Sequence, residues 1–238
     1  MISWLASYAR SGNTYLRVLL HHYYGIPTYN IYDDVPVNEK DLGTAEVTGF
    51  RPRPLPLAEM AAVAEHFFVK THELPADEYP AIYLVRDGRD CLVSYAHFIL
   101  RSGALGKDGP AEDTPDAFRN TLHDLIYYKA SFGGWPRHVL AWTGRAAPTA
   151  VIKFEDVVSR GDPLTTVQAA IDEIRRPVGA PVRTSSPPSF TQLHEISDRL
   201  FRRGKIGAWR DEMPPELVEL FWQENLEAMK RIGYGTQT

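Results

Sequence analysis

The stretch Ile2-Ser-Trp-Leu-Ala-Ser-Tyr8 and its continuation, Ala9-Arg-Ser-Gly-Asn-Thr14, decide the fold of this chain. The first part is apolar, as in a buried strand, and a segment with helical period follows from Tyr15 to Tyr24. A turn between a strand and a helix leaves several backbone N–H groups without helical partners. Because the helix dipole adds partial positive charge there, this turn is suited to bind an anion.

The side chains of this turn also fit a phosphate or a sulfate. Arg10 supplies a full positive charge, and Ser11 and Thr14 supply hydroxyl groups. Gly12 allows the backbone to approach a ligand closely. The turn lacks the G-x-x-x-x-G-K-[ST] spacing of a nucleotide triphosphatase P-loop. Since strand–turn–helix junctions are common without a ligand, the rest of the chain must decide its role.

Composition predicts one globular α/β domain over residues 1–238, since 44% of the residues are hydrophobic and 24% are charged. The net charge of −4 gives no general attraction to nucleic acid or acidic membranes, so we expect neither partner. The single cysteine, Cys91, excludes an internal disulfide and a CxxC motif. We expect a cytoplasmic protein, because no segment has the pattern of a membrane span or a signal peptide.

Short apolar stretches alternate with helical patterns along the chain. The expected strands are 2–8, 67–70, 81–85 and 149–154, and the expected helices are 14–24, 57–66, 91–100, 115–129, 164–174 and 214–232. This alternation predicts a P-loop-like α/β fold with a central parallel sheet flanked by helices on both faces. The irregular segments 26–56, 102–114 and 176–190 are long enough to form lids over a sheet edge.

A second polar group follows the third expected strand. Arg86 comes directly after that strand, Asp87 is placed to cap the next helix, and Ser94 lies on its second turn. An arginine and a hydroxyl at the carboxyl end of a parallel strand are a natural phosphate contact. The alternative is a solvated charge cluster at a helix start, made by Arg86, Asp87, Arg89 and Asp90.

The end of the second expected strand carries Lys70 and His72, which alternate by two and project to the same side if the strand continues. A histidine there can take a proton from a hydroxyl near neutral pH, although most lone histidines are structural. A later stretch, 201–210, holds four cations and two glycines. It is either a flexible loop that closes over a phosphate or an exposed basic turn.

Four of these segments, in this order, resemble the PAPS-dependent sulfotransferase family, where PAPS is 3′-phosphoadenosine 5′-phosphosulfate. The stretch from Tyr8 to Tyr15 resembles the 5′-phosphosulfate loop Y-P-K-S-G-T/N-T-W, and Lys70-Thr-His-Glu-Leu-Pro75 resembles K-T-H-L-P. The stretch from Arg86 to Ser94 resembles the 3′-phosphate motif R-x-x-x-D-x-x-x-S. Arg202-Arg-Gly-x-x-Gly-x-Trp209 resembles the loop R-K-G-x-x-G-x-W. The matched set spans nearly the whole chain.

The resemblance implies PAPS as donor, 3′,5′-ADP (PAP) as product, no metal, and a small-molecule acceptor with a hydroxyl or an amine. The residues that it assigns to the nucleotide are Arg10, Ser11, Gly12, Asn13, Thr14, Tyr15, Arg86, Ser94, Phe190, Arg202, Arg203 and Gly204. Arg10 and the turn 11–14 would hold the 5′-phosphosulfate, and Tyr15 and Phe190 would stack on adenine. Arg86, Ser94 and 202–204 would hold the 3′-phosphate.

The chemistry of in-line transfer agrees with this assignment. Negative charge develops on the bridging oxygen, so fixed positive charge is needed there. Lys70 and Arg10 are the candidates, and His72 is the expected general base. Arg10 stands where the family usually has lysine, and an arginine stabilises a leaving group without acting as its general acid.

Two alternatives remain at this point, a P-loop nucleotide kinase and a non-catalytic nucleotide-binding module. A kinase lacks support because the Gly-Lys-Ser/Thr of its loop is missing and no Mg²⁺-binding acidic residue ends a strand. A binding module would have no reason to place Lys70 and His72 at one strand end. The sequence does not identify the acceptor, and it leaves open whether the Pro-rich segment 26–56 serves a homodimer or a lid.

Overall fold

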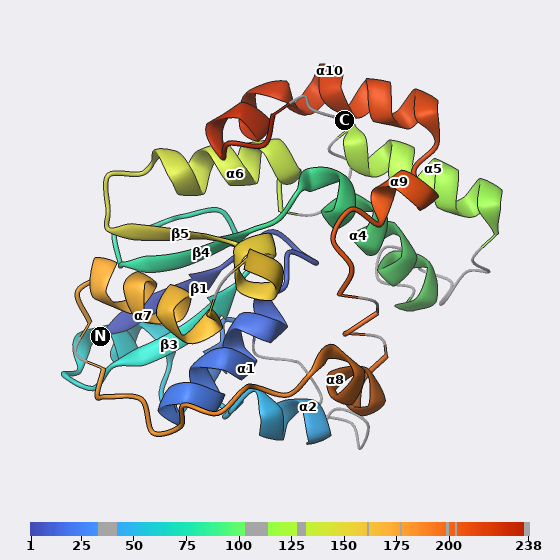
Figure 1. Ribbon diagram of the computed structural model, residues 1–238. Coiled ribbons are helices and arrows are strands. Elements are labelled where there is room, and N and C mark those ends of the chain that lie inside the picture. The colour runs from blue at the N-terminus through green and yellow to red at the C-terminus, as the bar shows by residue number, and fades with distance from the viewer. Residues whose placement is uncertain are drawn as a thin grey trace.

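The five described strands of the computed structural model are parallel, so their carboxyl ends all lie on the same side of the sheet. The structure describes residues 1–32, 42–102, 114–127, 132–160, 162–176, 178–198, 200–202 and 204–235. Within these ranges, the five strands of the sheet are ordered β2-β3-β1-β4-β5 and every pair is parallel. The strands are β1 (Ile2–Ala6), β2 (Thr28–Asn30), β3 (Phe67–Thr71), β4 (Ala81–Val85) and β5 (Thr149–Lys153). The central strand β1 therefore ends between β3 and β4 (Figure 1).

Helices cover both faces of this sheet, as predicted (Figure 1). One face, which bears Leu5 and Ile82, packs against α1 (Asn13–Tyr24), α7 (Pro163–Glu173) and α8 (Phe190–Ile196). The opposite face bears Trp4 and Tyr83. The apolar core on this face includes α4 (Gly88–Ser102) and α6 (Trp135–Gly144), and α5 (Pro115–Ile126) and α10 (Pro215–Arg231) pack on these two helices. Successive strand residues thus enter two separate apolar cores, which is the burial pattern of a parallel sheet.

Short helices complete the described part of the chain. They are α2 (Leu42–Val47), α3 (Leu57–Ala62), α9 (Trp209–Glu212) and the π-helical turn Asp156–Arg160. In the described ranges, no helix combines the length and the apolar character that crossing a membrane would require.

The sequence-based prediction differs from the structure at several elements. The strand β2 and the helix α2 lie in the segment 26–56, which was expected to be irregular. The helix α6 was missed, although its buried residues Trp135, His138, Val139 and Trp142 follow the i, i+3, i+4, i+7 spacing of one helical face. The helix expected at 57–66 ends at Ala62, because the next residue has an extended backbone. The predicted end of the 115–129 helix lies partly outside the described residues.

Candidate active site

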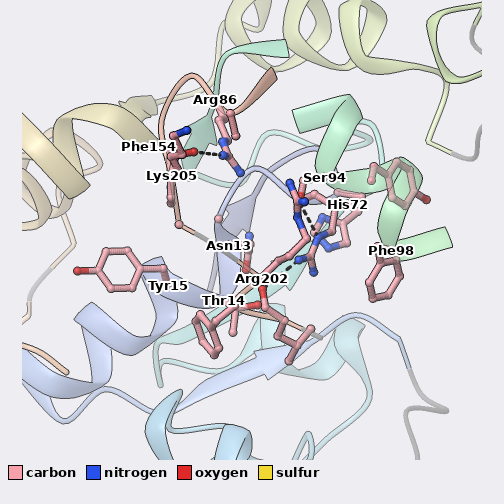
Figure 2. A pocket seen from close by; sticks show the side chains of 18 of the residues that line it. Asn13, Thr14, Tyr15, His72, Arg86, Ser94, Phe98, Phe154, Arg202 and Lys205 are labelled. Carbon is pink, nitrogen blue, oxygen red and sulfur yellow. Dashed lines mark hydrogen bonds between the residues drawn. The ribbon is translucent and has the colours of Figure 1, made fainter. Parts of the chain in front are cut away.

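A cavity of ≈ 360 Å³ lies at the carboxyl edge of the sheet, where the sequence places its candidate residues (Figure 2). Of the predicted site residues, those that line it are Arg10, Gly12, Asn13, Thr14, Tyr15, Lys70, His72, Arg86, Ser94, Phe190, Arg202 and Gly204. Ser11 lies beneath the turn, where its hydroxyl is 3.5 Å from the buried Cys91 Sγ. Arg203 falls outside the described residues. The structure therefore brings all four sequence motifs to one cavity.

The start of α1 offers backbone N–H groups to this cavity. The N-cap Gly12 provides no side-chain hydrogen bond, and no acidic residue stands in the first turn. The first carbonyl to accept is that of Gly12, which bonds the N–H groups of Tyr15 and Leu16 at 2.9 and 3.1 Å. The N–H groups of Asn13 and Thr14 come before the first hydrogen-bonded residue, so they have no acceptor within the helix. They lie at the positive end of the helix dipole. This arrangement suits an anion.

The geometry of the turn depends on a close contact with Phe154. Gly12 has φ +101°, and a Cβ built on it would lie 2.4 Å from the Phe154 ring. The Asn13 side chain anchors the same turn from below by donating to the Leu5 carbonyl at 2.9 Å and to Ser7 Oγ at 3.2 Å. Asn13 therefore contributes its N–H to the cavity, while its amide group holds the turn to β1.

Arg10 extends from this turn across the cavity. Its guanidinium donates to the Leu200 carbonyl at 3.0 Å and to Ser94 Oγ at 3.4 Å, and it lies 4.9 Å from the Phe98 ring centroid. Since an arginine remains protonated in proteins, this group is a permanent positive charge beside the turn.

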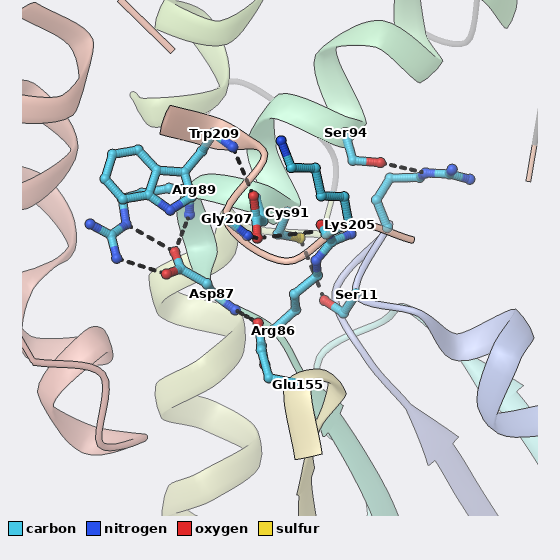
Figure 3. Close-up of polar contacts among 12 residues, drawn as sticks. Ser11, Arg86, Asp87, Arg89, Cys91, Ser94, Glu155, Lys205, Gly207 and Trp209 are labelled. Atoms are coloured by element: carbon cyan, nitrogen blue, oxygen red, sulfur yellow. Dashed lines mark hydrogen bonds and ion pairs between the residues drawn. The ribbon is translucent and has the colours of Figure 1, made fainter. Parts of the chain in front are cut away.

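The 202–209 loop is fastened to the start of α4 by a buried carboxylate (Figure 3). Asp90 accepts the N–H groups of Gly207 at 2.7 Å and Trp209 at 2.9 Å. Arg86 adds a bond from Nη2 to the Lys205 carbonyl at 3.0 Å and stacks on Phe154 at 4.7 Å. Its Nε is buried and has no hydrogen-bond partner among the described residues. A buried donor of this kind is costly unless a ligand satisfies it.

The charged residues at the start of α4 are buried, so their interpretation as a solvated cluster is wrong. Asp87 caps the helix by accepting the Arg89 N–H at 2.9 Å, and it also binds the Arg89 guanidinium at 2.7 Å (Figure 3). That guanidinium lies between the rings of Trp209 at 3.8 Å and Trp222 at 4.9 Å. The Asp87 N–H donates to Glu155 at 3.1 Å. These contacts fix the frame from which Arg86 projects.

Arg202 faces the cavity from the other side, but its charge is already paired. Its two Nη groups donate to the carboxylate oxygens of Glu212 at 2.8 and 3.1 Å, and its Nε is buried without a partner among the described residues. Close by, the Tyr15 and Phe190 rings contact each other with centroids 4.9 Å apart. They leave no slot between them, so a nucleobase would rest against their cavity side.

His72 is held by its backbone and by its ring. Its N–H donates to Tyr32 Oη at 3.0 Å, and its carbonyl accepts from His138 Nε2 at 3.1 Å. The ring Nδ1 is 2.7 Å from the Ser7 carbonyl, which can only accept, so Nδ1 carries the hydrogen. Burial and the nearby Lys70 charge hold the pKa of His72 well below 6.5. The ring is therefore neutral at pH 7, with the Nε2 lone pair available.

Lys70 and His72 line the same cavity, which confirms that they project to one side. The Lys70 ammonium lies 5.7 Å from the centroid of the Tyr32 ring. Burial, with smaller effects of the Arg17 and Arg10 charges, lowers the pKa of Lys70 to about 7. Lys70 is thus a cation whose charge is sensitive to pH, next to a neutral base.

A parallel sheet with the uncapped start of α1 and several arginines around one cavity defines a P-loop-like α/β protein with a site for an anion. The family model described as "Sulfotransferase domain" matches residues 3–168, and the chain belongs to that family. Its reaction is accordingly PAPS-dependent sulfuryl transfer, which confirms the predicted enzyme class and excludes the kinase alternative.

Curated relatives agree with this assignment. The chain is 25% identical to flavonol 3-sulfotransferase of Flaveria bidentis over a gapped alignment of 259 positions. This alignment covers 90% of this chain and 77% of that enzyme. It is 26% identical to sulfotransferase 1E1 of Rattus norvegicus, with 68% of this chain and 61% of the relative covered. The chain thus spans less than two thirds of the rat enzyme.

Solved structures show the same fold. Mouse sulfotransferase SULT7A1 complexed with PAP matches with a TM-score of 0.61 at 17% identity, over 96% of this chain and 83% of that one. Retinol dehydratase in complex with androsterone and PAP matches with a TM-score of 0.59 at 21% identity, over 96% and 80% of the two chains.

Sequence reasoning missed the residues that hold the site together. Asp90 was placed at the D of R-x-x-x-D-x-x-x-S, with a solvated charge cluster as the alternative, but no role in holding the 202–209 loop was assigned to it. Nothing in the sequence indicated that Glu212 pairs with Arg202. Phe132 was also missed, although its ring lies 5.5 Å from that of His72. No pattern in its neighbourhood marks it.

The Gly12–Phe154 contact predicts the effect of one added methyl group. In Gly12→Ala, strain from the positive φ and overlap with the ring should lower the free energy of unfolding by about 2–4 kcal/mol. Gly144→Ala is the matched control, because a Cβ there meets nothing within 4 Å. Urea denaturation should show that the control changes stability by at most about 1 kcal/mol, as in a helix. Equal stability of both variants would contradict the proposed contact.

Proposed function

We propose that this sulfotransferase holds PAPS with the 5′-phosphosulfate at the start of α1 and the 3′-phosphate between Arg86, Ser94 and Arg202. The sulfuryl group then passes to a hydroxyl or amine of a small-molecule acceptor, with His72 as general base. The observation that carries this proposal is that Arg86 and Arg202, which line the same cavity, each have a buried Nε with no hydrogen-bond partner among the described residues.

The residues present fit a nucleotide with two anionic ends. Two arginines whose buried Nε groups find no acceptor within the described ranges suit a phosphate, because charge-assisted hydrogen bonds to a phosphate are strong. The uncapped start of α1 and Arg10 suit a second anion at the other end of the cavity. Tyr15 and Phe190 provide an aromatic surface near both ends, on which an adenine ring can rest.

When bound, PAPS supplies an activated sulfuryl group, and the chain supplies charge and a proton acceptor. Arg10 and Lys70 place positive charge where the leaving phosphate would gain negative charge. His72 offers its unprotonated Nε2 because the Ser7 carbonyl fixes the hydrogen on Nδ1. Its backbone contacts to Tyr32 and His138 keep the ring in one position, as an oriented base requires.

The acceptor would lie against aromatic side chains next to His72. Tyr95, Phe98 and Phe132 line this part of the cavity, and Phe132 contacts the His72 ring. Such walls suit a small, largely apolar molecule that carries one reactive hydroxyl. Flavonol, androsterone and retinol, the hydroxyl compounds in the names of the similar proteins and structures, are small molecules with a large hydrocarbon part. Cytoplasmic location, a metal-free reaction and a homodimer remain predictions.

The 3′-phosphate contact predicts selective nucleotide binding. Calorimetry without added metal should show that 3′,5′-ADP binds more tightly than ADP or ATP, because only the first offers a 3′-phosphate to Arg86. Arg86→Ala should lower the affinity for 3′,5′-ADP by about tenfold or more, as expected for a charged hydrogen bond. Arg119→Ala is the control, because Arg119 pairs with Glu216 on the exposed surface. Preference for ATP with Mg²⁺ would refute the proposed site.

The role of His72 predicts a selective loss of turnover. His72→Ala should lower kcat by about 10²–10⁴-fold while the affinity for 3′,5′-ADP stays unchanged, because the ring acts on the acceptor. His123→Ala, at an exposed position on α5, should leave both quantities unchanged. Near-normal turnover of His72→Ala, measured with any accepted hydroxyl compound, would remove this residue from the mechanism.

The two titrating groups predict the pH profile of kcat/KM, which reports the free enzyme. Because the pKa of His72 is held well below 6.5, the loss of activity on the acid side of the profile should occur below that pH. The pKa of Lys70 is about 7, so its charge is present below this value and is lost as the pH rises through it. Activity should therefore decline above pH 7. Lys70→Arg should move this alkaline limb upward, and an unchanged limb would assign it to another group.

A further inference from the structure

The carboxylate of Glu212 forms an ion pair with Arg202, one of the two arginines proposed to bind the 3′-phosphate. Glu212 is the last residue of α9, and it binds both Nη groups of Arg202 at 2.8 and 3.1 Å. Each side chain of this pair is only 13% exposed, so water screens the interaction less than at the surface. An arginine binds phosphate best through two parallel N–H groups, and both Nη groups of Arg202 already donate to Glu212.

Glu212 is itself fixed in position, so it cannot follow Arg202 toward a ligand. His97 Nε2 donates to Glu212 Oε2 at 2.9 Å, and the His97 ring stacks on Phe118 with centroids 4.5 Å apart. On the loop side, α9 begins at Trp209, whose N–H is held by Asp90 at 2.9 Å. These contacts oppose a displacement of the Glu212 carboxylate away from Arg202.

Arg86 provides the internal comparison. Its nearest carboxylate, Asp90, lies 3.8 Å from Nη2 and accepts two backbone N–H groups instead of forming a bidentate pair. The charge of Arg86 is thus directed at the cavity, whereas that of Arg202 is neutralised by a direct partner. Two cationic residues that line the same cavity differ in how far each is available to an anion.

We propose that Glu212 limits the affinity of this site for 3′-phosphorylated nucleotides by competing with the 3′-phosphate for Arg202. This inference rests on the proposed function, since it requires that the 3′-phosphate binds near Arg202. Like charges placed side by side repel, so the carboxylate weakens the bound state as well. The consequence for the reaction is faster release of 3′,5′-ADP, a step that limits turnover in many enzymes.

The decisive variant is Glu212→Gln, which keeps the shape of the side chain and removes its charge. Isothermal calorimetry at fixed salt should show about tenfold tighter binding of 3′,5′-ADP, as expected when one charged hydrogen-bonding group becomes available. The affinity for 5′-AMP, which lacks the 3′-phosphate, should change by less than about twofold, within the range of a surface charge effect. Stopped-flow measurements should assign the gain to slower dissociation.

Two controls separate competition for Arg202 from a general charge effect. Glu216→Gln makes the same substitution at a carboxylate whose partner, Arg119, does not line the cavity and is exposed, so binding of 3′,5′-ADP should change by less than about twofold. In an Arg202→Gln background, Glu212→Gln should lose most of its effect, because the two substitutions are coupled through one ion pair. Thermal melting checks folding, and Glu212→Asp, too short for the bidentate contact, provides a second variant with partial tightening.

The outcomes distinguish this inference from the function on which it rests. If the wild type fails to prefer 3′,5′-ADP over 5′-AMP, the proposed function and this inference both fail. If the wild type shows the preference but Glu212→Gln binds 3′,5′-ADP equally or more weakly, Glu212 supports Arg202 and the competition is refuted. Equal tightening in Glu216→Gln, or an undiminished gain in the Arg202→Gln background, would likewise overturn it.

Discussion

The parallel pairing of β1 with β3 and β4 is the constraint on which the rest of the site depends. In its register, Ala6 at the end of β1 lies beside both Thr71 and Tyr83. The turn after β1 must therefore emerge between His72 and Arg86. This order places the start of α1 in the middle, with the proposed base on one side and the proposed 3′-phosphate arginine on the other. The layout of the reaction follows from the order of strands.

The sequence predicted the location of the site because parallel strands end at the same edge. Residues as distant as Arg10, His72 and Arg86 could be placed together from strand ends alone, and they line one cavity. What could not be predicted is how the charges there are balanced. The burial of Arg89 depends on two tryptophans from later segments, and the pairing of Arg202 depends on the short α9. Such contacts arise from packing and leave no local pattern.

Burial divides the basic groups of the cavity into two kinds. Arg10 and Arg86 bring guanidinium groups to the cavity, and these planar cations are suited to hold an anion. Lys70 and His72 respond to the same low-dielectric surroundings by losing protons more readily. The chain thus uses arginine where a constant charge is needed, and lysine and histidine where the protonation state matters to the chemistry.

The ring of Phe154 touches three parts of the nucleotide site: the backbone of Gly12, the guanidinium of Arg86 at 4.7 Å and the ring of Phe190 at 6.2 Å. A smaller side chain at position 154 would relieve the overlap with a Cβ at position 12 but not the strain of the positive φ, and it would remove the surface on which Arg86 stacks. One aromatic ring next to an edge strand thus supports both the shape of the turn and the position of an arginine.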